Sequence, residues 1–158
     1  MEESEIPVEE LYDKIKKKFS LPDFGPLDNE FEISTIEDEK FLLRQVAKKI
    51  SERLQNFQNI FADVLNPDIN SLAVLHESKF FDDVVKEKLF IAYQKLMLLQ
   101  RKFLEADVLL DDKNTAKLIN DAWIQYPSIK QETKLLVEQL KHTWEKALDP
   151  KEELRYFG

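Results

Sequence analysis

The sequence predicts an all-α fold, a single-domain antiparallel bundle of long helices with a short N-terminal helix. Glycine, the residue that most easily adopts the positive φ of tight β-turns, occurs only twice in 158 residues. Apolar residues recur at helical spacing from Leu42 to Leu148. The length of these periodic stretches favours helices that pack side by side over a long distance.

The first predicted helix covers residues 8–19. One apolar stripe runs along it, formed by Val8, Leu11, Tyr12, Ile15 and Phe19. Pro7 suits its first turn, where a missing N–H costs nothing. Pro22, Gly25 and Pro26 then interrupt the periodicity, and we expect residues 20–34 to form an ordered linker along the bundle.

The second predicted helix spans about residues 35–65. Ser34 and Glu37 have the spacing of a capping box, and Asn66-Pro67 ends the periodic stretch. Its apolar residues recur in alternating steps of three and four, which is the seam of long, nearly parallel helices. The seam consists of Leu43, Val46, Ile50, Leu54, Phe57, Phe61 and Val64.

A short helix at 69–79 leads into a long helix at 82–110, capped by Asp82 or a neighbour. The predicted core seam of the long helix is Val85, Leu89, Ala92, Leu96, Leu99, Phe103 and Ala106. Many further apolar residues lie off this seam, so the helix is central in the bundle or forms a subunit interface. We therefore hypothesise a homodimer that uses this helix or the N-terminal segment.

The last helical column is predicted at 115–148, with Asn114 as its cap and an interruption or kink at Pro127. Asp149-Pro150 should end it, because the residue before proline avoids the helical conformation. The chain is thus expected to comprise an N-terminal helix and linker at 1–34, a bundle domain at 35–149 and a tail at 150–158.

The charge and composition of the chain argue against several classes of function. Residues 1–39 hold 13 acidic residues against four lysines, whereas the remaining residues are nearly neutral, so an acidic arm carries the net charge of −8. Such a balance does not favour binding to nucleic acid or to anionic membranes. Cysteine is absent and the longest apolar run is Leu89 to Tyr93, so we expect a cytoplasmic protein that does not enter a membrane.

Catalytic and metal sites are not indicated by the sequence. His76 and His142 each lie near glutamates, yet neither completes the Glu-x-x-His pattern of a di-iron bundle, and His142 is expected to face solvent. Acidic pairs such as Asp82-Asp83 and Asp111-Asp112 are best explained as helix caps. We therefore predict a protein that is not an enzyme and has no catalytic residue, cofactor or metal.

Two groups of residues are candidates for binding. A basic face on the second predicted helix could follow phosphates or contact a partner, or it could be a solvated face paired with the acidic arm. It consists of Lys40, Arg44, Lys48, Lys49 and Arg53. Phe80 and Phe81, at a helix junction, are either core residues or an exposed anchor for a partner.

The C-terminus carries a further candidate. Its last eight residues run from Lys151 to Gly158, with Leu154 followed three positions later by Phe157. This spacing distantly resembles the tail motif by which proteins dock on the sliding clamp of replication. Lys151 stands where that motif has glutamine, and Gly158 where it has a second aromatic residue. The resemblance implies partner contacts by Leu154 and Phe157; the alternative is a tail that frays or folds onto the bundle.

The function that these observations favour is a non-enzymatic protein-interaction or assembly module inside the cell, with an unknown partner. The alternative is a nucleic-acid-associated protein that uses the basic face.

Overall fold

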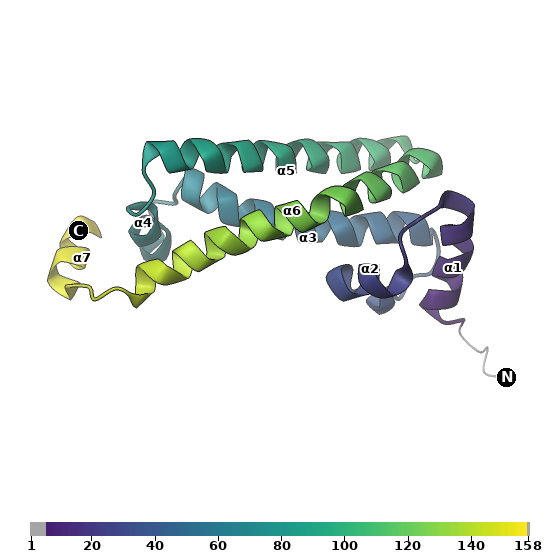
Figure 1. Cartoon of the computed structure of the whole chain (residues 1–158), viewed down its shortest axis with the longest axis horizontal. Helices are drawn as coiled ribbons and strands as arrows, with labels where there is room; N and C mark the ends of the chain where they lie inside the picture. Colours follow the sequence, from purple (N-terminus) through teal and green to yellow (C-terminus); the bar gives the residue numbers. More distant parts are fainter. Residues whose placement is uncertain (1–5, 158) are drawn as a thin grey trace. The chain divides into compact units, whose positions relative to one another are not determined.

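The computed structural model describes the backbone of residues 6–157 and the side chains of residues 6–154, and this part of the chain is all-α (Figure 1). It confirms the predicted bundle of long helices. The elements are α1 (Val8–Phe19), α2 (Phe24–Phe31), the 3₁₀ turn η1 (Ile33–Thr35), α3 (Leu42–Leu65), α4 (Leu72–Ser78), α5 (Asp83–Leu109), α6 (Asp112–Glu145) and α7 (Pro150–Phe157). None of the helices in the described range is long and apolar enough to cross a membrane.

The chain divides into two compact units. Unit 1 comprises residues 1–55 and 98–126, and unit 2 comprises residues 56–97 and 127–158. The long helices α3, α5 and α6 each contribute one end to unit 1 and the other end to unit 2. The segment boundaries that the sequence suggested at residues 34 and 149 stay a prediction.

In unit 1 the predicted α3 seam forms the core. Leu43, Val46, Ile50 and Leu54 are at most 5% exposed, and the α5 seam residue Leu99 is 2% exposed. They are joined from α6 by Ala116, Leu118, Ile119 and Ala122, and from α5 by Phe103 and Ala106. Apolar burial of this kind is the main stabilising contribution to a helical core.

A polar pair fixes the register of α3 against α5 within unit 1. The Ser51 hydroxyl donates to the Gln100 amide oxygen at 3.0 Å, and the Gln100 amide nitrogen donates to the Ser51 carbonyl at 3.0 Å. Nearer the start of α3, the Arg44 guanidinium reaches the Leu110 carbonyl at 3.4 Å. Moving forward along α3 therefore means moving backward along α5, so the two helices are antiparallel.

The N-terminal segment belongs to the core of unit 1. Tyr12 of α1 is fully buried, and its hydroxyl donates to the Pro22 carbonyl at 2.6 Å. Phe31 of α2 packs against Trp123 and Tyr126 of α6, with ring centroids 6.2 and 4.7 Å away. The predicted helix at 8–19 is confirmed, and Leu27, Phe31 and Ile33, which follow it, are buried.

The linker expected at 20–34 was wrong in its local structure, because it contains α2 and η1. Gly25 and Pro26 stand in the first turn of α2, where backbone N–H groups have no helical acceptor and a proline is tolerated. Burial of Leu27 and Phe31 then holds this short helix in place. The sequence signal that could have revealed it is the i, i+4 spacing of these two apolar residues.

The capping box predicted at Ser34 and Glu37 was also wrong. Ile33 and Ile36 are both buried, which holds the chain in a 3₁₀ turn followed by an extended residue. The helix α3 starts only at Leu42, after Phe41 with φ at 58°. Two buried isoleucines here outweigh a cap whose separate contribution is about 1 kcal/mol.

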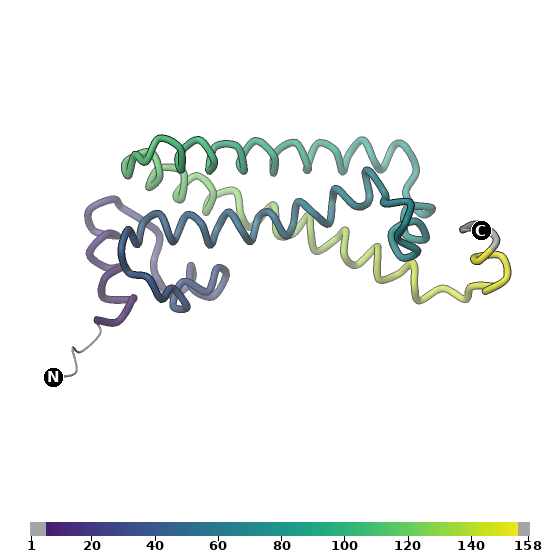
Figure 2. The backbone as a smooth tube through the Cα atoms, turned by 180° about the vertical axis from the view of Figure 1, so that it is seen from behind, coloured from purple at the N-terminus to yellow at the C-terminus, as the bar shows by residue number. Residues whose placement is uncertain are grey.

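In unit 2, α3 ends, α4 forms a short connection and α5 begins (Figure 2). The remaining seam residues Phe57, Phe61 and Val64 are buried, as predicted. The Ser71 hydroxyl caps α4 by accepting from the Val74 N–H at 3.3 Å. Asp82 caps α5 in the predicted manner, by accepting from the Val85 N–H at 2.9 Å.

The last long helix, α6, begins earlier than predicted and is not interrupted. Asp111 rather than Asn114 is its cap, since its carboxylate accepts from the Lys113 N–H at 3.0 Å. The helix continues through Pro127, which is also where its residues pass from unit 1 to unit 2. A proline inside a helix removes one backbone hydrogen bond, because its nitrogen carries no hydrogen.

The helix α7 lies at Pro150–Phe157, within the segment predicted as a C-terminal tail. Pro150 occupies its first position, and the Asp149 carboxylate accepts from the Lys151 N–H at 2.9 Å. In unit 2, α7 packs against α4. The same Asp149-Pro150 pair that indicated the end of one helix therefore begins another.

Candidate functional site

The predicted basic face does not form one stripe on α3. Lys40 precedes the helix, Arg44 and Lys48 lie on one side, and Lys49 and Arg53 lie about 140° around the helix from them. Lys40 and Lys48 are exposed, whereas Lys49 is half-buried. The five cations therefore do not present a continuous row to a phosphate backbone.

Arg44 is engaged within unit 1. Its guanidinium lies 3.7 Å from the Asp112 carboxylate, donates to the Leu110 carbonyl and stacks over the Phe41 ring at 4.7 Å. These contacts hold the loop between α5 and α6 against the start of α3. The Arg44 side chain therefore stabilises the fold of unit 1 through these contacts.

Arg53 takes part in a second polar cluster of unit 1, around Tyr126. The Tyr126 hydroxyl donates to the Glu30 carboxylate at 2.9 Å and also interacts with the Arg53 guanidinium. Burial raises the pKa of this phenol, Arg53 opposes the rise and Glu30 adds to it. The acidic N-terminal segment therefore reaches the predicted basic face through Glu30 and Tyr126.

His76 is the most buried polar side chain of unit 2. It is 2% exposed, its Nε2 lies 3.2 Å from the Thr143 carbonyl, and its Nδ1 lies 2.9 Å from the Glu153 carboxylate. Both ring nitrogens therefore have a hydrogen-bond partner, and His76 links α4 to α6 and α7.

Glu153 completes this cluster from α7. Its carboxylate accepts from both the Lys79 ammonium and the His76 ring. Lys79 first, and His76 second, hold the pKa of Glu153 below its usual range, against the opposing effect of burial. The sequence spacing could not indicate this cluster, because its members come from segments more than 70 positions apart.

Aromatic rings cover the histidine. The Trp144 ring lies 4.1 Å from the His76 ring, and its Nε1 donates to the Glu77 carboxylate at 3.2 Å. Phe80 meets the edge of His76 at 5.2 Å and lies under the Lys146 ammonium. Both nitrogens of the ring are therefore hydrogen-bonded within unit 2, and aromatic side chains pack around it.

The residues predicted to contact a partner differ in how far the structure exposes them. Phe81 is buried at 6% exposure, so it belongs to the core of unit 2, whereas Phe80 is 37% exposed. Leu154 of α7 is 64% exposed. The side chain of Phe157 lies outside the described residues.

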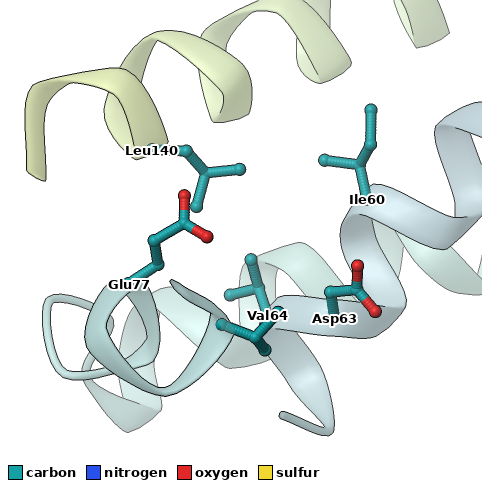
Figure 3. Close-up of a pocket in the computed structure, with 6 residues that line it drawn as sticks. Ile60, Asp63, Val64, Glu77 and Leu140 are labelled. Atoms are coloured by element: carbon teal, nitrogen blue, oxygen red, sulfur yellow. The ribbon is translucent and has the colours of Figure 1, made fainter. Parts of the chain in front are cut away.

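His142 and a small pocket are the remaining features of unit 2. His142 faces solvent beside Glu145, as predicted. The pocket, of about 120 Å³, is lined by the apolar Ile60, Val64, Val74 and Leu140 together with Asp63 and Glu77 (Figure 3). It is smaller than the roughly 300 Å³ at which ligand pockets begin. No group of three metal-ligating side chains occurs among the residues that the structure describes.

The outward face of α5 in unit 1 exposes several large apolar side chains close together. Leu98, Leu104, Val108 and Leu109 are 58%, 53%, 74% and 57% exposed. They share an arc of about 140° that lies opposite the buried Leu99, with the exposed Arg101 and Glu105 between them. We call these six residues the outer α5 face. The apolar residues that lie off the predicted seam include Leu98, Leu104 and Leu109 of this face, whereas Val108 was not among them.

No protein-family model, curated protein or solved structure matches this chain, so its own residues carry the argument on function.

Proposed function

We propose that this chain is a non-enzymatic interaction module that binds an amphipathic helix of a partner protein on the outer α5 face. The observation that carries this proposal is a helix with apolar residues on opposite sides. The inner side is used by the core of unit 1, and the outer side exposes four large apolar residues within three turns. A helix that is apolar on both sides needs a neighbour on both sides.

The composition of the outer α5 face suits a regulated or reversible contact. Two charged side chains lie among its four apolar ones, as at the mixed apolar and polar surfaces of non-obligate interfaces. Covering the exposed part of four such side chains contributes about 1 kcal/mol each. The absence of cysteine agrees with an interaction inside a reducing, cytoplasmic compartment.

Nucleic-acid binding, the alternative function, has less support. Arg44 and Arg53 already have partners within unit 1, and the other three cations do not lie on one side of α3. Phosphate binding depends on several cations that contact one backbone together. We therefore place this alternative second.

A photo-cross-linking experiment tests the proposed function. A benzophenone amino acid replaces Val108 on the outer α5 face and, as a matched control, Ile124, which is the exposed apolar residue of α6 in unit 1. We expect illumination in cells to give covalent adducts with protein from position 108 and few from position 124. Equal labelling at both positions, or no protein adduct at 108, would contradict the proposal.

A further inference from the structure

We infer that the partner on the outer α5 face is a second copy of this chain, whose α5 lies antiparallel to the first about a two-fold axis. This inference rests on the proposed function, because it names the occupant of the same face. Its basis is the order of residues along that face. Leu98 and Val108 lie at equal distances before and after position 103, and so do Arg101 and Glu105.

The spacing is that of a coiled-coil seam. Leu98, Arg101, Glu105 and Val108 follow steps of three, four and three, so they form a line of a and d positions on the outer side of α5. Leu104 and Leu109 lie beside this line. At 1.5 Å per residue, the seam extends over about 15 Å, enough for one turn of contact on either side of the axis.

Symmetry makes this seam complementary to itself. A two-fold contact places the same patch of both copies face to face, so a residue on one copy meets its counterpart across the axis. In the antiparallel pair, Leu98 meets Val108 of the second copy, and Arg101 meets its Glu105. Two apolar pairs therefore enclose two ion pairs.

The charges also select the antiparallel arrangement. A parallel pair would place Arg101 against Arg101 and Glu105 against Glu105, which is unfavourable. Both side chains are exposed, and neither takes part in an ion pair with the side chains that the structure describes. An arginine that precedes a glutamate by four residues is also the weaker order for a pair within one helix. Both charges are thus available to a second copy.

The size of the seam predicts a weak dimer. Four half-exposed apolar side chains per copy fall below a standard interface, and ion pairs at its rim are screened by salt. We expect a dissociation constant on the order of tens of micromolar at low salt, rising at high salt. The apolar pairs provide most of the affinity, and the ion pairs provide the orientation.

Charge reversal with mixing tests this geometry. R101E leaves two acidic residues on the seam and E105R leaves two basic ones, so each variant alone repels its own copy. We expect sedimentation at about 200 µM to show the unmodified chain largely dimeric and each single variant at least tenfold weaker. An equimolar mixture of both variants should restore the dimer, and so should the double variant R101E/E105R.

Lys117→Glu, a charge reversal at an exposed position of α6 in unit 1, provides the control and should leave the dimer unchanged. A chain that stays monomeric at this concentration overturns the inference. Dimers that neither single variant weakens overturn it equally. If position 108 cross-links only to other proteins, the partner is not a second copy of this chain, but the proposed function stands. If position 108 gives no protein adduct at all, both the inference and the proposed function are refuted.

Discussion

The outer α5 face of unit 1 and the histidine cluster of unit 2 place polar and apolar side chains in opposite ways. Unit 1 leaves Leu98 and Val108 in water, at 58% and 74% exposure. Unit 2 buries His76, with Thr143 and Glu153 satisfying both ring nitrogens. Apolar surface exposed to water costs free energy unless another molecule covers it. A buried polar group whose hydrogen bonds are all formed carries no such cost.

This difference decides which feature points to function. Residue type alone would favour the histidine, because histidine with glutamate and lysine is a common catalytic combination. The structure gives both ring nitrogens of His76 a hydrogen-bond partner within unit 2, so the cluster holds α4, α6 and α7 together. The apolar residues of the outer α5 face have ordinary chemistry, yet more than half of each side chain is exposed to solvent.

The largest expected effect is on the free energy of unfolding, and it distinguishes the buried side of the unit 1 helices from their exposed side. Leu54→Ala removes a fully buried side chain and should lower the free energy of unfolding by about 2–5 kcal/mol. Leu98→Ala makes the same chemical change on the exposed side and should cost less than about 0.5 kcal/mol in dilute solution. Urea denaturation followed by circular dichroism measures both, and equal losses would remove the distinction between core and outer face.

The two histidines provide the next comparison. His76→Leu should lower the free energy of unfolding by about 1–3 kcal/mol, because the Thr143 carbonyl and the Glu153 carboxylate both lose a hydrogen-bond partner. His142→Leu, at an exposed position, should have almost no effect. The same denaturation measurement applies, and similar values for the two variants would mean that the buried hydrogen bonds contribute nothing.

Acid should weaken the α7 contact. The pKa of Glu153 is lowered in the folded chain, so its contribution to stability is present above the unfolded pKa and is lost as the pH falls through the folded pKa. Thermal unfolding from neutral pH down to the acid range should show this loss, and Glu153→Gln should reduce the slope. An unchanged slope in the variant would show that Lys79 and His76 do not stabilise the ionised carboxylate.

The smallest expected effect concerns the predicted basic face at the start of α3 and just before it. Lys48→Glu combined with Lys40→Glu should not change the binding of labelled DNA or RNA at low salt, because we expect no measurable binding to begin with. Removing the acidic arm is a poor alternative test, since Tyr12, Leu27 and Phe31 are core residues of unit 1. Tight binding by the unmodified chain that both substitutions abolish would instead favour the nucleic-acid function.

Periodicity predicted the parts of the fold that depend on repeated burial. The α3 seam from Leu43 to Val64 is buried at every predicted position, and α1 has its predicted bounds. Local cap signals were less reliable. Ser34 begins no helix because the neighbouring isoleucines are buried, and α7 lies in a segment that showed no long apolar stripe.

The candidate sites depended on contacts that no sequence spacing reveals. The off-seam leucines of α5 were visible as surplus apolar residues, and the structure shows which of them remain exposed. The partners of His76 could not be inferred, because Glu153 lies 77 positions away in a helix that was expected to be a tail. The sequence indicated that Arg44 is a cation on the helix surface, whereas the fold places Asp112 beside it.

The most direct test of the central claim is a methyl NMR measurement of solvent access at rising protein concentration. A soluble paramagnetic agent relaxes exposed methyl groups, and Leu98, Leu104, Val108 and Leu109 should be strongly relaxed in dilute solution. We expect these four to become protected at about 200 µM, while Ile124 stays relaxed and Leu54 stays protected throughout. If the methyl groups of the outer α5 face remain as relaxed as Ile124 at every concentration, the second copy does not cover this face and the account is contradicted.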